Sequence, residues 1–155
     1  MMAGQKGNDM KRQDKYPETR TFHYFNANPK NRITGDCRIR AISVACEVPY
    51  NQVVMDLAKI QCETGYDQCT NQGIDILMKR YGWKKQRQPR KLNNTKYTGE
   101  EWCNQIQEGL CVNGKSLDRL VANIGGNHVV AIIDGKVWDI WDSTDGCIGN
   151  YWVKD

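Results

Sequence analysis

The sequence predicts a single α+β domain in which helices come first and an antiparallel β-sheet follows. Three observations support this prediction: the chain length, apolar residues at helical spacing in the first half, and two apolar runs around an Asp-Gly pair near the end. A chain of 155 residues with 39% hydrophobic residues is long enough for one hydrophobic core and leaves little room for a second. Helices and strands that are segregated along the chain are typical of α+β proteins.

Residues 1–20 contain almost no apolar side chain except methionine. Such a segment cannot bury enough surface to become ordered, so we expect a flexible N-terminal arm and one domain over residues 21–155. The domain is expected to begin with Thr21–Phe25, a short aromatic run typical of a strand. Residues 26–35 are rich in turn-forming residues and predict a loop.

Apolar residues recur at helical spacing in three segments, residues 36–46, 49–60 and 71–81. The first of these predicted helices places Ile39 and Ile42 on its buried face. Its two arginines, Arg38 and Arg40, are expected to project outward. The helical half of the protein is therefore predicted to consist mainly of three amphipathic helices.

Three further segments complete the predicted fold. The stretch from Thr98 to Glu101 has the spacing of a capping box, which predicts a short helix over residues 102–109. Residues 117–124 suit either a strand or a helix. Residues 129–141 consist of two apolar runs around Asp134-Gly135, and this pattern is a strong hairpin signal.

Charge and hydropathy indicate that neither a nucleic acid nor a membrane is an expected partner. The 22 Lys and Arg against 18 Asp and Glu give 22 − 18 = +4, a mild excess, and residues 84–97 hold six of these cations. We expect an exposed basic loop there, with a phosphate or acidic-partner contact as the alternative. No phosphate loop or zinc-finger spacing accompanies it, so nucleic acid is an unlikely partner. The longest apolar run, Val129–Ile133, is far below the roughly 18 to 20 residues of a membrane span, so no membrane contact is expected.

The seven cysteines are an odd number, which is not what a fully disulfide-bonded secreted domain would show. No secretory signal opens the sequence, so we expect a reducing, cytoplasmic compartment. No Cys-x-x-Cys pair is present, and a structural zinc site is therefore not expected. The sequence predicts neither a metal nor a cofactor.

Cys37 is the best candidate for a nucleophile. It follows Gly35-Asp36 and leads directly into the first predicted helix. A thiol at a helix N-terminus lies near the positive end of the dipole and near unpaired N–H groups, and both favour the thiolate. Of the two histidines, His128 is the better candidate for a base, because it opens an apolar strand whereas His23 lies near the arm.

An acidic residue beside His128 would fix the ring tautomer and stabilise the imidazolium. If Asp134-Gly135 forms a two-residue turn, Asp139 takes the same face of the hairpin as His128. If the turn has three residues, the register moves by one and Asp142 takes that face. The residues alone leave both registers open.

These motifs resemble those of the papain-like cysteine peptidase superfamily, most closely its small phage- and prophage-encoded members. The resemblance extends over about residues 26–152 and follows the chain order Cys, His, Asp. It is carried by three short motifs, which are Gly35-Asp-Cys37 before a helix, Gly125-Gly-Asn-His128 at the start of a strand, and Trp141-Asp142-Ser at the end of the next strand.

The resemblance implies a papain-like fold and a cysteine peptidase or related amide hydrolase that forms a thioester with a peptide or protein substrate. It implies Cys37 as the nucleophile, His128 as general base and acid, and Asp142 as the orienting residue, because the family residue lies where the second strand ends. It also implies that Asn31, at the position of a glutamine in the family, donates to the oxyanion hole.

The alternative is a catalytically silent papain-like protein, such as a phage accessory protein that uses the basic residues 84–97 to bind a protein or nucleic acid. If the chain is encoded by a phage, the expected location is the host cytoplasm. The sequence predicts no particular oligomeric state.

Overall fold

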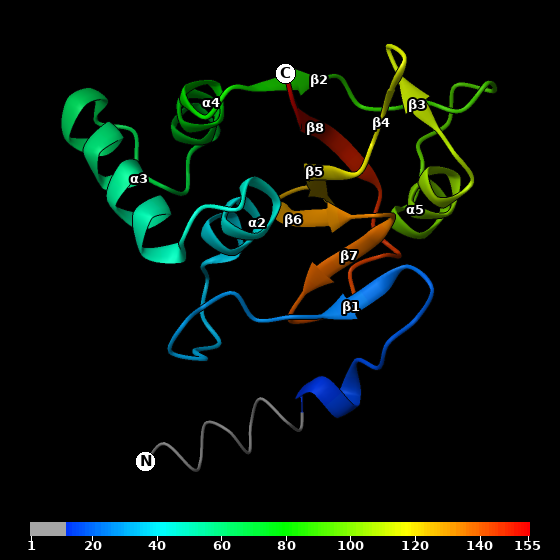
Figure 1. The fold of residues 1–155 in the computed structure, drawn as a ribbon, viewed down its shortest axis with the longest axis horizontal. Coiled ribbons are helices and arrows are strands. Elements are labelled where there is room, and N and C mark those ends of the chain that lie inside the picture. Colours follow the sequence, from blue (N-terminus) through cyan, green and yellow to red (C-terminus); the bar gives the residue numbers. More distant parts are fainter. Residues whose placement is uncertain (1–11) are drawn as a thin grey trace.

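A computed structural model describes residues 12–155 as a six-stranded sheet with helices on both faces (Figure 1). Helices α2, α3 and α4 lie on one side of the sheet, and α5 lies on the other. The helices are α2 (Cys37–Cys46), α3 (Tyr50–Thr64), α4 (Asn71–Arg80) and α5 (Gly99–Gln107). The strands are β1 (Phe22–Tyr24), β2 (Trp83–Gln86), β3 (Cys111–Val112), β4 (Lys115–Ser116), β5 (Arg119–Ile124), β6 (His128–Ile133), β7 (Lys136–Asp139) and β8 (Ile148–Lys154).

The sheet has the strand order β1-β7-β6-β5-β8-β2, and β3 and β4 form a separate two-stranded sheet. The β6–β7, β5–β6, β5–β8 and β2–β8 pairs are antiparallel, which confirms the predicted arrangement of helices followed by a mostly antiparallel sheet. The exception is β1, which pairs in parallel with β7 so that Phe22 lies opposite Val137. The first strand therefore forms one edge of a sheet whose other strands follow the three helices α2–α4.

The hairpin between β6 and β7 uses the shorter of the two predicted turns. Ile133 lies opposite Lys136, so the turn consists of Asp134 and Gly135 alone. Their φ values are 50° and 76°, as the type I′ turn requires of both central residues. This turn fixes the register of β7 against β6, and with it the position of every side chain on β7.

The predicted helices are confirmed, with small changes at their ends. At the start of α5, the Thr98 side chain accepts from the N–H of Glu101, whose carboxylate accepts from the N–H of Thr98. This is the predicted capping box, although the helix begins at Gly99 rather than at residue 102. Among residues 12–155, no helix is long and apolar enough to cross a membrane.

Two segments of the sheet differ from the sequence prediction. The predicted basic loop begins with an edge strand, because β2 pairs with β8 and places Lys85 opposite Trp152. β8 itself was not predicted from its sequence, although it pairs with both β2 and β5. The ambiguous residues 117–124 contain β5, which lies between β6 and β8.

The core lies on both faces of the sheet. On one face, Ile39 and Ile42 of α2 pack with Val129 and Ala131 of β6. On the other face, Trp102 of α5 belongs to a cluster formed mainly by side chains from β5, β6 and β8. The packing of α2 against β6 brings the N-terminus of the helix to the end of the sheet where β6 begins, and this position is central to the candidate site.

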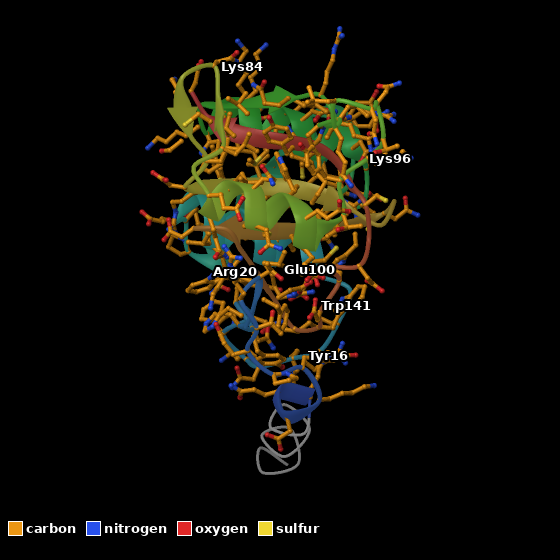
Figure 2. All side chains as sticks on the ribbon, turned by 90° about the vertical axis from the view of Figure 1, so that its right-hand side faces the viewer. Tyr16, Arg20, Lys84, Lys96, Glu100 and Trp141 are labelled. Atoms are coloured by element: carbon orange, nitrogen blue, oxygen red, sulfur yellow. The ribbon has the colours of Figure 1, made fainter. Side chains whose placement is uncertain are left out.

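Residues 1–11 of the predicted arm lie outside the described residues, whereas residues 12–20 contact the domain. Arg12 Nε donates to the carbonyl oxygen of Ile140 at 2.7 Å, and Tyr16 packs against the cluster that contains Trp102. Figure 2 shows Tyr16 at the opposite end of the protein from Lys84. The described part of the arm is therefore attached to the domain near the end of β7.

We predict that Ile42→Ala destabilises the protein by about 2–5 kcal/mol, because the side chain is fully buried between α2 and the sheet and its removal leaves a cavity. The free energy of unfolding from urea denaturation measures the effect. Met55→Ala on α3 is the control, since the Met55 side chain is 66% exposed and its loss is expected to change stability by no more than about 0.5 kcal/mol. Equal losses in the two variants would contradict this account of the core.

Candidate active site

The first element of the candidate site is the N-terminus of α2, which begins at Cys37. The preceding residue, Asp36, occupies the N-cap position, but its side chain makes no capping hydrogen bond. The N–H groups of the first helical turn have no intrahelical acceptor, and they point toward the N-terminal end of the helix. The half-buried Cys37 thiol therefore lies at the positive end of the α2 dipole, as the sequence predicts.

The second element is the start of β6, where a turn with positive φ at Gly125 and Gly126 leads into His128. The His128 imidazole forms a hydrogen bond with the Cys37 thiol, and the backbone N–H of Val129 donates to the same sulfur. Burial raises the pKa of the Cys37 thiol, but these two hydrogen bonds and the positive charges of His128 and Arg38 together bring it below its ordinary value. The contacts therefore favour a thiolate.

The third element is Asp139 at the end of β7. Its Oδ2 lies 2.5 Å from Nε2 of His128, and its side chain is 2% exposed. Because Nε2 is bound to Asp139, the other ring nitrogen, Nδ1, is the one left for the Cys37 thiol. Burial lowers the pKa of His128, but the hydrogen bonds to Asp139 and Cys37 outweigh it and raise the value to about 9. These shifts favour a thiolate–imidazolium pair at neutral pH.

A buried arginine holds the other oxygen of Asp139. Arg40 donates from one terminal nitrogen to Asp139 Oδ1 at 2.5 Å, and the N–H of Ile140 donates to the same oxygen at 2.8 Å. The Nε of Arg40 donates to Asp36 Oδ1 at 2.7 Å. The prediction that Arg40 projects outward is therefore wrong, since its side chain is only 6% exposed. The two carboxylates beside it explain why a cation is tolerated there, since a buried charge requires a partner.

The network continues from Asp36 into the helical layer. Asp36 Oδ2 accepts from the Tyr50 hydroxyl at 2.6 Å and from the Asn28 side-chain amide at 3.0 Å. These bonds explain why Asp36 does not cap α2, because both of its carboxylate oxygens bind other groups. These four side chains alternate in charge along the network. They come from the N-cap of α2, from α2 itself, from β7 and from β6, in the order Asp36, Arg40, Asp139 and His128.

Trp141 covers one side of the imidazole. The ring centroids of Trp141 and His128 are 4.9 Å apart, with an angle of 40° between the ring planes. This contact limits the access of water to the ring and holds it in one orientation. The His128 side chain is 17% exposed, so part of the ring remains accessible.

The structure does not bring Asp142, the favoured orienting residue, to His128. Asp142 Oδ1 instead accepts from the N–H and the hydroxyl of Thr144, at 3.0 and 2.6 Å, and so closes a turn. Asp142 lines a small pocket together with Glu100 and Asn104 of α5, on the other side of the sheet from α2. The two-residue turn between β6 and β7 is the physical reason, because it gives the register in which Asp139 reaches His128.

Asn31, the predicted oxyanion-hole residue, lies in an exposed turn before α2. Its φ is 54°, and its backbone N–H donates to the carbonyl oxygen of Asn28 at 2.9 Å. Nothing in these contacts tests a role in an oxyanion hole, which stays a prediction. The N–H groups at the start of α2 are donors already positioned beside the thiol.

The other cysteines have environments unlike that of Cys37. All seven are free thiols, and burial raises the pKa of both Cys46 and Cys103 to about 12. Cys103 is buried and Cys46 is half-buried, and neither thiol has a basic residue in hydrogen-bond contact, so both serve as small apolar groups. Among residues 12–155, no group of three His, Cys, Asp or Glu side chains is placed to hold a metal ion.

The basic segment of residues 84–97 is partly neutralised within the protein. Lys85 forms an ion pair with Asp75, and Lys91 forms one with Glu101. Arg90 donates to the carbonyl oxygen of Asn94. These intramolecular contacts reduce the number of cations that the segment can offer to a phosphate or an acidic partner.

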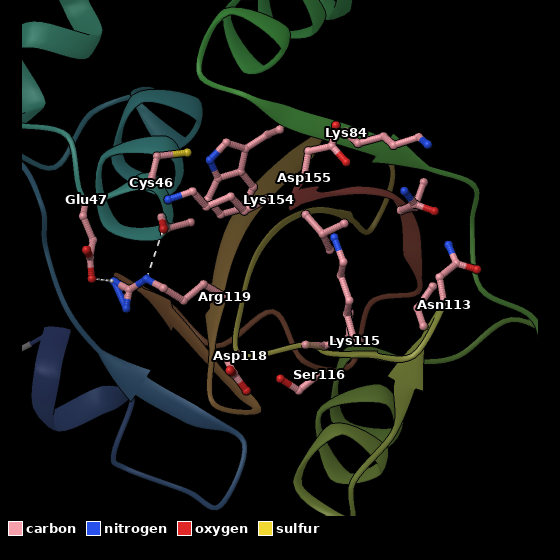
Figure 3. A pocket seen from close by; sticks show the side chains of 16 residues that line it. Cys46, Glu47, Lys84, Asn113, Lys115, Ser116, Asp118, Arg119, Lys154 and Asp155 are labelled. Atoms are coloured by element: carbon pink, nitrogen blue, oxygen red, sulfur yellow. Dashed lines mark hydrogen bonds and ion pairs between the residues drawn. The ribbon is translucent and has the colours of Figure 1, made fainter.

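A pocket of about 460 Å³ lies at the other end of α2, beside Cys46 (Figure 3). Cys37 and Cys46 are the first and last of the ten residues of α2, which places them about 14 Å apart along the helix axis. Arg119 lines this pocket and is bound to Glu47 and to the carbonyl oxygen of Ala45. The pocket is therefore separate from the Cys37–His128 pair and carries no part of its chemistry.

In comparisons with known proteins, no family model matches the chain, and no curated protein or solved structure matches it either. The interpretation of the site therefore depends on its own geometry. That geometry consists of a thiol at a helix N-terminus, an imidazole bonded to it, and a buried carboxylate behind the imidazole.

We predict that the His128 ring titrates with a midpoint of about 9 and that Asp139→Asn lowers this midpoint, because the amide carries no negative charge to stabilise the imidazolium. NMR of the ring carbon-bound protons measures the titration, and His23→Gln assigns the signals of the two histidines. Asp142→Asn is the matched control and is expected to leave the midpoint unchanged. A midpoint that responds to Asp142→Asn and not to Asp139→Asn would contradict the assignment.

We also predict that Arg40→Met lowers the free energy of unfolding by about 3–5 kcal/mol, because it leaves Asp36 and Asp139 buried without their cation. Chemical denaturation measures the loss. Arg80→Met is the control, since Arg80 pairs with Glu63 where both side chains are more than 40% exposed and such a pair contributes about 1 kcal/mol or less. Similar losses in both variants would show that the Arg40 network is not needed for stability.

Proposed function

We propose that this protein is a cysteine peptidase or related amide hydrolase with Cys37 as nucleophile, His128 as general base and acid, and Asp139 as orienting residue. The observation that carries the proposal is the position of His128, bonded on one side to the Cys37 thiol and on the other, at 2.5 Å, to the buried Asp139. The arrangement joins a nucleophile, a base and an orienting acid, which is the pattern required for covalent acyl transfer.

In the first half of the proposed reaction, the Cys37 thiolate attacks the carbonyl carbon of an amide and forms an S–C bond. The negative charge that develops on the carbonyl oxygen is stabilised by N–H groups at the start of α2. His128, which is protonated at neutral pH because its pKa is about 9, gives its proton to the leaving nitrogen as the C–N bond breaks. The products of this half are a free amine and a thioester on Cys37.

In the second half, His128 is neutral and accepts a proton from water while the water oxygen bonds to the acyl carbon. The S–C bond breaks, the acyl group leaves as a carboxylic acid, and the thiolate–imidazolium pair is restored. The two oxygens of Asp139 accept hydrogen bonds from His128, Arg40 and the N–H of Ile140. Asp139 keeps the ring in place through both halves of the cycle.

A papain-like relationship is part of the proposal. A nucleophile at the start of a helix, followed along the chain by a histidine and an acid on neighbouring antiparallel strands, agrees with the resemblance carried by the sequence motifs. Peptides or proteins are the substrate class that this relationship implies. A reducing compartment, such as the cytoplasm, agrees with seven unpaired thiols and with a nucleophile that must remain reduced.

The site also favours catalysis over a silent binding role. Four charged side chains in a buried network are costly to remove from water, and the network ends at a partly exposed imidazole beside a thiol. A binding surface has no need of this arrangement. The ion pairs of Lys85 and Lys91 further reduce the support for the basic segment as the functional surface.

We predict that iodoacetamide at pH 7 modifies Cys37 at least about tenfold faster than the exposed cysteines, because only a few per cent of an ordinary thiol is ionised at that pH. Mass spectrometry of the digested protein measures the rate at each thiol, so that the exposed Cys62, Cys69, Cys111 and Cys147 serve as internal references. His128→Ala is expected to remove the difference. Uniform labelling of the accessible thiols in the unmodified protein would rule out the proposed nucleophile.

A further inference from the structure

A cleft of about 420 Å³ opens beside the proposed catalytic pair. Its lining includes Arg38, which directly follows Cys37, and Asn127, which directly precedes His128. Gly126 and Gly149 also line the cleft, and the absence of side chains at these positions keeps it open. A substrate bound to Cys37 therefore has space to extend into this cleft.

Arg38 supplies the only charge among the residues that line the cleft. Within residues 12–155, Arg38 forms no ion pair with a carboxylate, and its Nε is buried without a hydrogen-bond partner. This contrasts with Arg40, two residues later in α2, which is held by Asp36 and Asp139. A buried guanidinium nitrogen without a partner is costly, and a carboxylate bound to this guanidinium would supply a compensating negative charge.

The remaining polar lining consists of side-chain amides, which belong to Asn71, Gln88, Asn123, Asn127 and Asn150. Asn150 Oδ1 accepts from the backbone N–H of Gln88 at 3.1 Å, so the group that Asn150 offers to the cleft is its NH2 donor. The Gln88 side-chain NH2 donates to the carbonyl oxygen of Ile148 at 2.7 Å, so the donor orientation is defined for Asn150 alone. An amide donor together with a guanidinium complements a carboxylate, whose two oxygens accept several hydrogen bonds. No residue that lines the cleft carries a negative charge that would repel such a ligand.

The larger pocket beside Cys46 lacks this selectivity (Figure 3). Lys84, Lys115 and Lys154 line it together with Glu47, Asp118 and Asp155. Its charges are thus of both signs, and they do not favour an anionic ligand over a cationic one. The cleft beside Cys37 is different because its single charge is positive and without a partner.

We infer that this cleft is the substrate-recognition site and that Arg38 binds a carboxylate of the peptide substrate close to the amide bond that Cys37 attacks. The inference rests on the proposed hydrolase function and adds to it the class of substrate, namely a peptide with a carboxylate near the bond to be cleaved. The planar guanidinium matches a carboxylate through two parallel N–H···O bonds, which a lysine cannot form. Either an acidic side chain or a free chain terminus supplies this group.

The test is protection of Cys37 from iodoacetamide by three peptides of otherwise identical alanine sequence. The first carries one Glu and has blocked termini, the second carries Gln in its place, and the third carries Gln and a free C-terminal carboxylate. We expect the Glu peptide, the free-terminus peptide or both to protect at a concentration about tenfold or more below that of the blocked Gln peptide. The two carboxylate peptides identify which source the cleft accepts.

Arg38→Gln is expected to abolish the preference, and Arg90→Gln, at an exposed arginine outside the cleft, is expected to retain it. The comparison uses protecting concentrations within each variant, so a changed alkylation rate in Arg38→Gln does not affect it. An unchanged His128 titration in Arg38→Gln confirms that the site is intact. Equal protection by all three peptides, or a preference that survives Arg38→Gln, would overturn the inference.

The same experiment separates this inference from the proposed function. Selective alkylation of Cys37 without peptide tests the nucleophile alone. If that selectivity is absent, the hydrolase proposal fails, and calorimetric binding of the same three peptides to Cys37→Ala still decides whether the cleft prefers a carboxylate. Tighter binding of a carboxylate peptide supports the inference that the cleft binds a carboxylate, and equal binding of the three peptides overturns that inference.

Discussion

The arrangement of this protein depends on a buried chain of alternating charges that runs from Asp36 through Arg40 and Asp139 to His128. Each charge is costly to bury alone, and each is stabilised by a neighbour of opposite sign at hydrogen-bond distance. Arg40 is the central member because it holds one carboxylate from the N-cap of its own helix and one from β7. The network therefore joins α2 to the sheet. This contact places the Cys37 thiol of α2 beside the His128 imidazole of β6.

The contacts that stabilise this network also shift the pKa values of His128 and Cys37. Asp139 accepts from three donors, and its hydrogen bond to His128 helps to raise the pKa of the imidazole to about 9. The resulting positive charge and the hydrogen bond from the ring lower the pKa of Cys37 despite its burial. A change that loosens α2 from the sheet is therefore expected to affect the pKa of Cys37 as well as the stability of the fold. Trp141 adds a contact with the imidazole that does not depend on charge.

The two arginines of α2, Arg38 and Arg40, have different surroundings because they lie at different positions on the helix. Arg40 lies between two carboxylates and is part of the internal network. Arg38, two residues earlier, lines the cleft and has no carboxylate partner among the described residues. The helix that begins at Cys37 thus carries one arginine that is held inside the protein and one that lines a cleft. The sequence shows two equivalent arginines, and the difference arises from what surrounds them.

The sequence by itself determined the parts of this protein that depend on local pattern. Helical spacing predicts the three helices α2–α4, the capping box predicts α5, and the Asp134-Gly135 pair predicts the hairpin, because each signal lies within a few consecutive residues. The pairing of Cys37 with His128 also follows from local signals, one at a helix start and one at a strand start. Only the tertiary structure decided that Asp139 rather than Asp142 contacts His128, that Arg40 is buried, and that β1 joins the sheet in parallel. These features depend on strand register and on distant partners, since Arg40 and Asp139 are 99 residues apart and the paired Phe22 and Val137 are 137 − 22 = 115 residues apart. No local pattern encodes such partners.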